Sequence, residues 1–301
     1  MPWIALALLS AAILAGSNLL DKTVAYHYVT TPLTMPLMIG IAHTLLGVII
    51  LAVVSVPDGA CTSAVLSALA SGALIGVGGL MWILVLYRQE VSRVVPVTQT
   101  APIFAAVLAV VFLGETMSTT QWLSVMATVT GAIVISLKIG ENYRDIFIHR
   151  SFFILIAAAI ILASANIIGK SALTDLPIMY THGLRSVGLG GTFFIFGSRR
   201  ASYANLAGLI RTRSPGLLVF GFNEYVLANG ALLLLLAALS QGPASLVLAL
   251  AGTRAMFIVV LSTTVALLWK GALGEDITRR AITVKAAAVT LIVAGIIGVS
   301  V

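Results

Sequence analysis

Runs of apolar residues alternate with short polar turns along almost the whole chain. A helix needs about 20 apolar residues to span the hydrocarbon core of a bilayer, and ten runs reach that length. They cover residues 3–22, 33–56, 62–87, 92–113, 118–138, 151–173, 177–198, 215–238, 243–269 and 281–301. The pattern predicts an all-α integral membrane protein with ten transmembrane helices. The first run lacks a basic leader, so we interpret it as a retained helix and not as a signal peptide.

Composition narrows the class of protein further. Of the 301 residues, 60% are hydrophobic and 9% are charged, which lies outside the range of soluble domains. The single cysteine, Cys61, excludes a disulfide framework and a cysteine-built metal site. The net charge of +7 comes from residues in short turns, not from a basic face with interleaved aromatic residues. These basic residues are therefore expected to determine how the helices are oriented in the membrane. No nucleic-acid partner is expected.

The chain contains an internal repeat. Residues 13–23 (ILAGSNLLDKT) return as residues 161–171 (ILASANIIGKS), with five of eleven positions identical. Each copy begins a set of five apolar runs, and an odd number of crossings makes the second set enter the membrane from the opposite side. We therefore expect two inverted five-helix repeats, residues 1–140 and 149–301, joined by a loop at 141–148.

Other pairs of residues support the repeat. Leu113-Gly114-Glu115 follows the fourth predicted helix, and Leu273-Gly274-Glu275 follows the ninth. Two five-helix halves, an asparagine late in helices one and six, and this Leu-Gly-Glu turn resemble the EamA-like family of the drug/metabolite transporter superfamily. The resemblance covers nearly the whole chain. It implies a ten-helix secondary carrier that alternates access to a central cavity.

The basic residues predict how the chain lies in a cell membrane. If the amino terminus is on one side, 14 of the 17 lysines and arginines fall on the other. Arg185 and Arg254 lie within helices, so only Lys170 remains on the amino-terminal side. Because cytoplasmic loops are rich in Lys and Arg, both termini are expected to be non-cytoplasmic. Relatives in the resembled family usually keep both termini inside, so charge and resemblance disagree here.

Charged or titratable side chains near the middle of the membrane are candidate functional residues, because they are costly there. With a rise of about 1.5 Å per residue, four lie near the midplane: His43, Arg185, Glu224 and Arg254. An arginine suits carboxylate or phosphate through its bidentate fork. We expect Arg254 to be the main ligand contact, with Arg185 in reserve. The alternative is that Glu224 forms a structural ion pair with one of these arginines.

The repeated polar residues have two interpretations. Asn18 and Asn166 lie near opposite faces of the membrane and either gate the two mouths of a cavity or join neighbouring helices. Lys22 and Lys170, one turn further along, are expected to be anchors at the membrane interface and not ligands.

Four more residues complete the candidate substrate site. Gln99 lies in segment 94–102, where two prolines free backbone carbonyls that must find partners in the bundle. Trp82 and Tyr225 are candidates for a cavity wall, and Asn229 is expected to share the face of Tyr225 because it follows one helical turn later. Simple packing is the alternative for the proline segment.

Together these patterns favour a secondary active transporter of a small organic metabolite, anionic or zwitterionic. The alternatives are an exporter of cationic drugs or quaternary amines and a lipid-phosphate flippase. An intramembrane enzyme using Glu224 with His43 or His182 is least favoured. Glu224 or His43 are candidates for proton coupling. No cofactor or metal is expected, because the histidines are scattered and there is no nucleotide-binding loop. The chain is expected to be a monomer or a homodimer.

Overall fold

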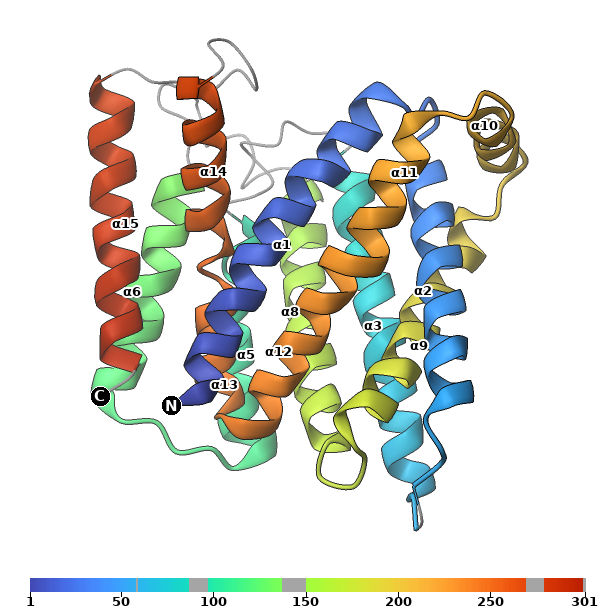
Figure 1. The fold of residues 1–301 in the computed structure, drawn as a ribbon. Coiled ribbons are helices and arrows are strands. Elements are labelled where there is room, and N and C mark those ends of the chain that lie inside the picture. The colour runs from blue at the N-terminus through green and yellow to red at the C-terminus, as the bar shows by residue number, and fades with distance from the viewer. Residues whose placement is uncertain (58, 87–96, 137–149, 269–278, 300–301) are drawn as a thin grey trace.

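The computed structural model describes residues 1–57, 59–86, 97–136, 150–268 and 279–299, and these form helices and the turns between them (Figure 1). The helices are α1 (Pro2–His27), α2 (Thr34–Val53), α3 (Thr62–Leu86), α5 (Ala101–Leu113), α6 (Thr119–Ser136), α8 (Arg150–Ala172), α9 (Ile178–Gly197), α10 (Arg200–Arg211), α11 (Pro215–Phe222), η1 (Asn223–Ala228), α12 (Asn229–Gln241), α13 (Ala244–Ala251), α14 (Arg254–Leu268) and α15 (Arg279–Val299). Each apolar run of the sequence contains at least one of them. The chain is therefore an all-helical bundle over its described residues, whereas the expected connecting loop at 141–148 lies outside them.

Several of these helices match a bilayer in length and apolar character. Within the described residues, six spans qualify: Pro2–His27, Thr34–Val53, Thr62–Val85, Ser151–Ala172, Pro215–Gln241 and Ala244–Leu261. Two apolar segments, Ala101–Leu113 and Thr283–Val299, are shorter. The bundle is thus that of a multi-pass membrane protein.

Helices from the two halves of the chain pack directly on one another. α2 lies against α9, α3 against both α8 and α9, and α6 against α15, while α1 crosses α12, α13 and α14. Glycines allow the closest approaches: a Cβ atom added to Gly47 would lie 2.8 Å from the carbonyl oxygen of Gly183. Small residues at such crossings let backbones meet, which is how helices commonly associate in membranes.

Two of the long apolar spans are not regular helices. Residues 215–241 run through α11, a π-helical turn (η1) and α12, so the ladder of hydrogen bonds changes register in mid-span. Residues 244–268 break at Gly252 and Thr253, between α13 and α14. Because π turns occur mostly as single insertions at functional sites, η1 marks a region to inspect for function.

The polar stretch 199–214 forms a further helix that the apolar pattern did not predict. α10 buries Leu209 in a cluster with Val24 and Phe220, while Arg200 and Arg211 at its two ends are exposed. Such an amphipathic helix suits the boundary between lipid and water better than the membrane interior. Figure 1 shows it beside the end of the bundle where α11 begins, whereas α1 begins and α15 ends at the opposite end.

Candidate functional site

A small polar pocket lies between α2, α3, α9 and α12. Its lining residues are His43, Ile75, His182, Arg185, Ser186, Leu189 and Leu232. The side chains enclose space for roughly one water molecule, so a larger solute enters only if the helices move apart.

Arg185 is the charged centre of this pocket. Its side chain is buried, and its Nη2 donates a hydrogen bond of 3.0 Å to Oδ1 of Asn166 on α8. The guanidinium lies against Gly169, where an added Cβ would be 3.1 Å from its Cζ atom. Among the described residues Arg185 has no carboxylate partner. The fold therefore holds a buried cation in place with a neutral amide.

The two repeated asparagines have different surroundings. Asn166 donates from Nδ2 to the carbonyl of Leu162 at 3.0 Å, which turns its oxygen toward Arg185. Asn18 forms no hydrogen bond with another described residue and is half-buried. Asn166 thus positions the pocket arginine, and Asn18 remains a candidate for a cavity mouth.

Glu224 pairs with a histidine and with neither arginine in the part of the chain that the structure describes. Its Oε2 lies 3.2 Å from Nε2 of His43, and both side chains are almost fully buried. The alternative interpretation, an ion pair of Glu224 with Arg185 or Arg254, is therefore not observed among the described residues. This pairing leaves the charge of Arg185 uncompensated.

The π turn also changes which residues share a face with Glu224. Asn229 donates from Nδ2 to the backbone carbonyl of Glu224 at 2.5 Å and is buried, whereas Tyr225 is 43% exposed. The expectation that Asn229 shares the face of Tyr225 is wrong, because a π turn places residue i+5 over residue i. Tyr225 does not line the pocket.

Sequence reasoning missed two residues beside Glu224. Asp21 on α1 accepts a hydrogen bond of 2.7 Å at its Oδ1 from Nδ2 of Asn223, which is fully buried. The carboxyl groups of Asp21 and Glu224 are also close enough to interact. The signal was available in the sequence, because an aspartate inside an apolar run is itself costly.

The substrate site predicted from the sequence also omitted a third residue, His182. It lines the pocket beside Arg185 and is close enough to Arg185 and His43 to interact with both electrostatically. From the sequence it was considered only for an enzyme.

Three expected site residues lie elsewhere. Arg254 begins α14, is half-buried, and forms no hydrogen bond or ion pair with another described residue. Gln99 is buried in the turn ahead of α5. Trp82 packs in an apolar cluster with Val97 and Leu155. None of these three lines the pocket around Arg185.

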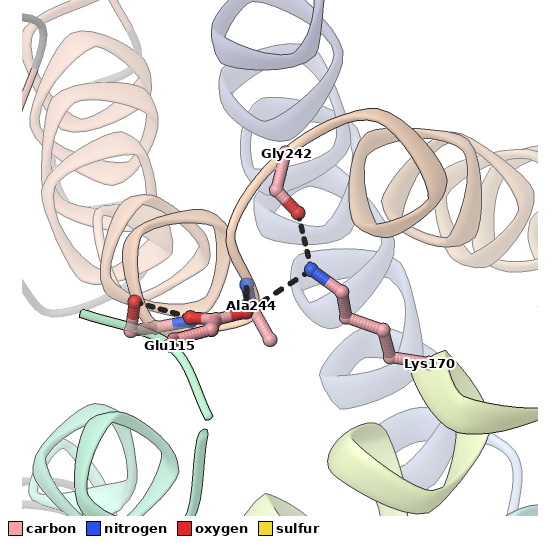
Figure 2. Close-up of polar contacts among 5 residues, drawn as sticks. Glu115, Lys170, Gly242 and Ala244 are labelled. Atoms are coloured by element: carbon pink, nitrogen blue, oxygen red, sulfur yellow. Dashed lines mark hydrogen bonds and ion pairs between the residues drawn. The ribbon is translucent and has the colours of Figure 1, made fainter. Parts of the chain in front are cut away.

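A second polar site joins the two halves of the chain at one end of the bundle (Figure 2). Lys170 donates from Nζ to Oε1 of Glu115 at 3.1 Å and to the carbonyl of Gly242 at 2.6 Å. Glu115 also accepts hydrogen bonds from the backbone N–H of Ala244 and Ser245, at 2.5 and 3.0 Å. The hydroxyl of Ser245 donates to it at 2.7 Å. We call Glu115, Lys170 and residues 242–245 the latch.

The latch holds a carboxylate at the first turn of α13, where free N–H groups and the helix dipole favour negative charge. Partial burial raises the pKa of Glu115, but the hydrogen bonds from Ser245 and Ala244 and the charge of Lys170 outweigh it and lower the pKa below its ordinary value. Lys170 is thus an ion-pair partner and not a free interfacial anchor. Its repeat counterpart, Lys22, is exposed.

The latch lies next to the start of α1. A Cβ added to Gly242 would lie 2.6 Å from the ring of Trp3, which belongs to an apolar cluster shared by α1, α5, α12 and α13. This end of the bundle is therefore tightly packed. The second copy of the Leu-Gly-Glu turn, residues 273–275, lies outside the described residues.

Apolar spans that surround a buried, charged pocket are features of a multi-pass membrane protein with a polar site in its interior. Residues 1–137 match the model of the EamA-like transporter family, which confirms the resemblance over these residues. Members of that family are membrane transporters and not enzymes. One solved crystal structure aligns with 98% of this chain and 96% of its own, with a TM-score of 0.65 and 14% sequence identity. At this identity the likeness shows the fold alone. No curated protein matches the chain.

Proposed function

We propose that this chain is a secondary active transporter that carries a small anionic or zwitterionic metabolite across the cell membrane by alternating access. The observation that carries the proposal is Arg185, a buried guanidinium in the pocket whose hydrogen-bond partner is the neutral amide of Asn166. A charge in the membrane interior requires compensation. An anionic solute is the partner that Arg185 lacks.

The chemistry of Arg185 favours a carboxylate or phosphate group. A guanidinium has five N–H donors in a planar fork, and Asn166 takes one hydrogen bond from it. Bidentate binding of an anion uses the remaining donors and is among the strongest hydrogen-bonded pairs. His182 beside it supplies a further polar contact. The substrate in this proposal therefore binds with its anionic end at Arg185.

The packing of the helices supports an inverted repeat of residues 1–140 and 149–301. A two-fold axis that exchanges the halves turns the contact of α3 with α8 into that of α12 with α1, and both contacts exist. It also pairs α2 with α9, α5 with α13 and α6 with α15, which pack on one another. Such repeats commonly serve alternating access, because one half can rock against the other around a fixed site.

The narrow pocket and the latch fit one step of that cycle. The pocket has no room for an organic solute, so the proposed carrier must open before it binds. The latch closes the end of the bundle where α1 begins. It does so through contacts of α8 with the turn after α5 and with the turn between α12 and α13. In this proposal, breaking the latch opens that end.

The carboxyl groups of Asp21 and Glu224 favour a second candidate, an exporter of cationic drugs or quaternary amines. Such ligands are usually held by aromatic faces as well as by carboxylates. Trp82 packs in an apolar cluster and Tyr225 is exposed, so neither expected aromatic wall faces the pocket. The anionic or zwitterionic substrate, with a lipid phosphate as one variant, remains the better-supported proposal.

A thermal-shift screen of the purified protein in detergent tests the proposal. Wild type, Arg185→Leu and Arg254→Leu are each screened against carboxylates, phosphates, amino acids and quaternary amines. A ligand at 100 times its Kd stabilises the folded state by about 2.7 kcal/mol, which raises the melting temperature measurably. We expect anions to stabilise wild type and Arg254→Leu but not Arg185→Leu.

The comparison with Arg254→Leu shows whether a loss of stabilisation is specific to Arg185. Loss of stabilisation in Arg254→Leu alone would move the binding site to α14. Stabilisation of wild type by quaternary amines alone would favour the cationic exporter.

A further inference from the structure

Four polar residues form a buried network that Arg185 does not use. His43 of α2 meets Glu224, Glu224 interacts with Asp21, and Asn223 donates to Asp21 at 2.7 Å. The network thus joins α1 to α2 through the π turn. His43, Asn223 and Glu224 are each at most 3% exposed, and Asp21 is half-buried. We call these four residues the acidic network.

Two carboxyl groups in contact inside a membrane bundle cannot both be charged without a large electrostatic cost. The repulsion is strong because the low dielectric of the interior does not screen it. Pairs of this kind share one proton, which lies on one carboxyl and is attracted by the other.

The acidic network also contains buried polar atoms without partners. Oδ1 of Asn223 and Nδ1 of His43 have no hydrogen-bond partner in the described part of the chain, although both side chains are more than nine-tenths buried. Orphaned groups of this kind are rare in folded proteins and call for a partner.

From this geometry we infer that Asp21 and Glu224 hold one shared proton and that this proton is the coupling ion of the transporter. The inference rests on the transport function proposed above for its role, but the proton site itself is independent of any solute. It adds Asp21 and Asn223 to a site in which sequence reasoning considered only Glu224 and His43.

The coupling step requires only proton binding and release. A proton from water on one side forms one O–H bond with a carboxylate oxygen, so the charge of the two carboxyl groups changes from −2 to −1. When α1 moves away from η1, the two groups separate and the repulsion that favoured the proton disappears. The O–H bond then breaks, and the proton leaves to water on the other side.

The π turn gives this step a deformable element. Glu224 is the second residue of η1, so a change between π and α register rotates it relative to Asp21. The amide of Asn229 holds the carbonyl of Glu224 and thereby stabilises the present register. Register changes of this kind couple a helix movement to the position of one side chain.

Other charged groups surround the acidic network. α9 contributes His182 and Arg185 at the pocket, and α1 contributes the exposed Lys22. α11 and α12 have no titratable side chains, and Arg254 of α14 forms no ion pair with Asp21. In a network with one bound proton, the one remaining negative charge lies beside His43 of α2, whose Nε2 is 3.2 Å from Oε2 of Glu224.

Infrared difference spectroscopy of the purified protein without any solute tests the proton site. The C=O stretch of a protonated carboxylic acid is distinct from the bands of carboxylates and amides. In wild type at neutral pH, we expect a band from a buried protonated carboxyl that disappears as the pH is raised. The band should disappear at a lower pH in Asp21→Asn and also in Glu224→Gln, because each substitution removes the repulsion that helps to keep the other group protonated. Glu115→Gln, outside the acidic network, should keep the wild-type pH dependence.

Three outcomes would overturn the inference. They are no titrating band in wild type, a band whose pH dependence is unchanged in both variants, and a change in one variant only, which would assign the proton to a single residue. Displacement of the band by Na⁺ at constant ionic strength would assign the site to a metal cation instead. If the band behaves as expected but no solute stabilises the protein in the thermal-shift screen, the proton site stands and the proposed transport of an anion falls.

Discussion

At the scale of single residues, the acidic network and the pocket differ at one matching position of the repeated segment. Asp21 and Gly169 occupy the same place in the two copies, three residues after Asn18 and Asn166. Asp21 adds a carboxyl group beside Asn223, whereas Gly169 leaves room for the guanidinium of Arg185. The first copy of the repeated segment thus carries an acid where the second copy leaves space for a cation.

The space at Gly169 gives the first prediction. In Gly169→Ala, the new Cβ would lie 2.7 Å from Oγ of Ser71 and 3.1 Å from Cζ of Arg185, so Ser71 must shift and the guanidinium must move by a few tenths of an ångström. Since a displacement of about 1 Å at a binding group reduces function as much as 100-fold, we expect this smaller movement to lower anion affinity in the thermal-shift assay by about 3-fold.

Gly16→Ala is the control for this substitution. It lies in the matching segment of α1, and a Cβ there meets no atom within 4 Å. Both changes raise helix propensity equally, by about 1 kcal/mol. Equal anion affinity in the two variants would show that Gly169 does not position Arg185.

At the scale of elements, the latch ties α8 to the ends of α5 and α12 and to the start of α13. The Leu-Gly-Glu turn allows this because Gly114 adopts φ 65°, a left-handed conformation that ends α5 and directs Glu115 toward α13. Three hydrogen bonds from Ala244 and Ser245 and the charge of Lys170 then compensate a single carboxylate. Charge and hydrogen bonds at the latch therefore hold these helices together in addition to apolar packing.

The charge of Glu115 gives a prediction about pH. A group whose pKa is lower in the folded state stabilises the fold above its unfolded pKa, and this contribution is lost as the pH falls through the folded value. We expect Glu115→Gln and Lys170→Met to lower the free energy of unfolding at neutral pH by about 1–3 kcal/mol. For Glu115→Gln the difference from wild type should vanish in acid. Thermal unfolding across a pH series measures it.

Lys22→Met is the matched control for Lys170→Met. Lys22 has the same place in the repeat but is exposed, so its removal should change stability by less than about 0.5 kcal/mol. A destabilisation that does not depend on pH in Glu115→Gln would contradict an ionised latch.

At the scale of the whole molecule, α1 begins and α15 ends at the same end of the bundle, next to the latch (Figure 1). The exposed arginines at the two ends of α10 lie at the other end. Basic residues concentrate on the cytoplasmic side of membrane proteins. The distribution of charge therefore continues to favour non-cytoplasmic termini, and the latch then closes the outer end of the pathway.

Fusion reporters test this orientation. A phosphatase that is active only outside the cytoplasm should be active when fused after Val301, and a reporter that requires the cytoplasm should be inactive there. Fusions within residues 212–214, after α10, should show the reverse. Activity of the cytoplasmic reporter at Val301 would contradict the orientation and agree with the usual arrangement in the EamA-like family.

The sequence by itself determined the class of protein, the apolar helices and the repeated segment, because length, hydropathy and internal similarity are local properties. It also identified His43, Glu224 and Arg185, because a charge in an apolar run is visible without a structure. The amphipathic α10 and the π turn were missed, since a short helix rich in polar residues and a change of register leave no apolar run of the required length.

Only the tertiary structure decided which charges meet. Depth along a helix made Arg185 and Arg254 equivalent, but α9, which carries Arg185, borders the pocket, whereas α14, which carries Arg254, contributes no residue to it. One added residue in the π turn joins Asn229 to Glu224 and directs Tyr225 outward. The role proposed for Asp21 depends on the contact of α1 with η1, which the sequence does not show. Contacts between helices from different halves are set by packing over long distances in sequence, which local patterns do not encode.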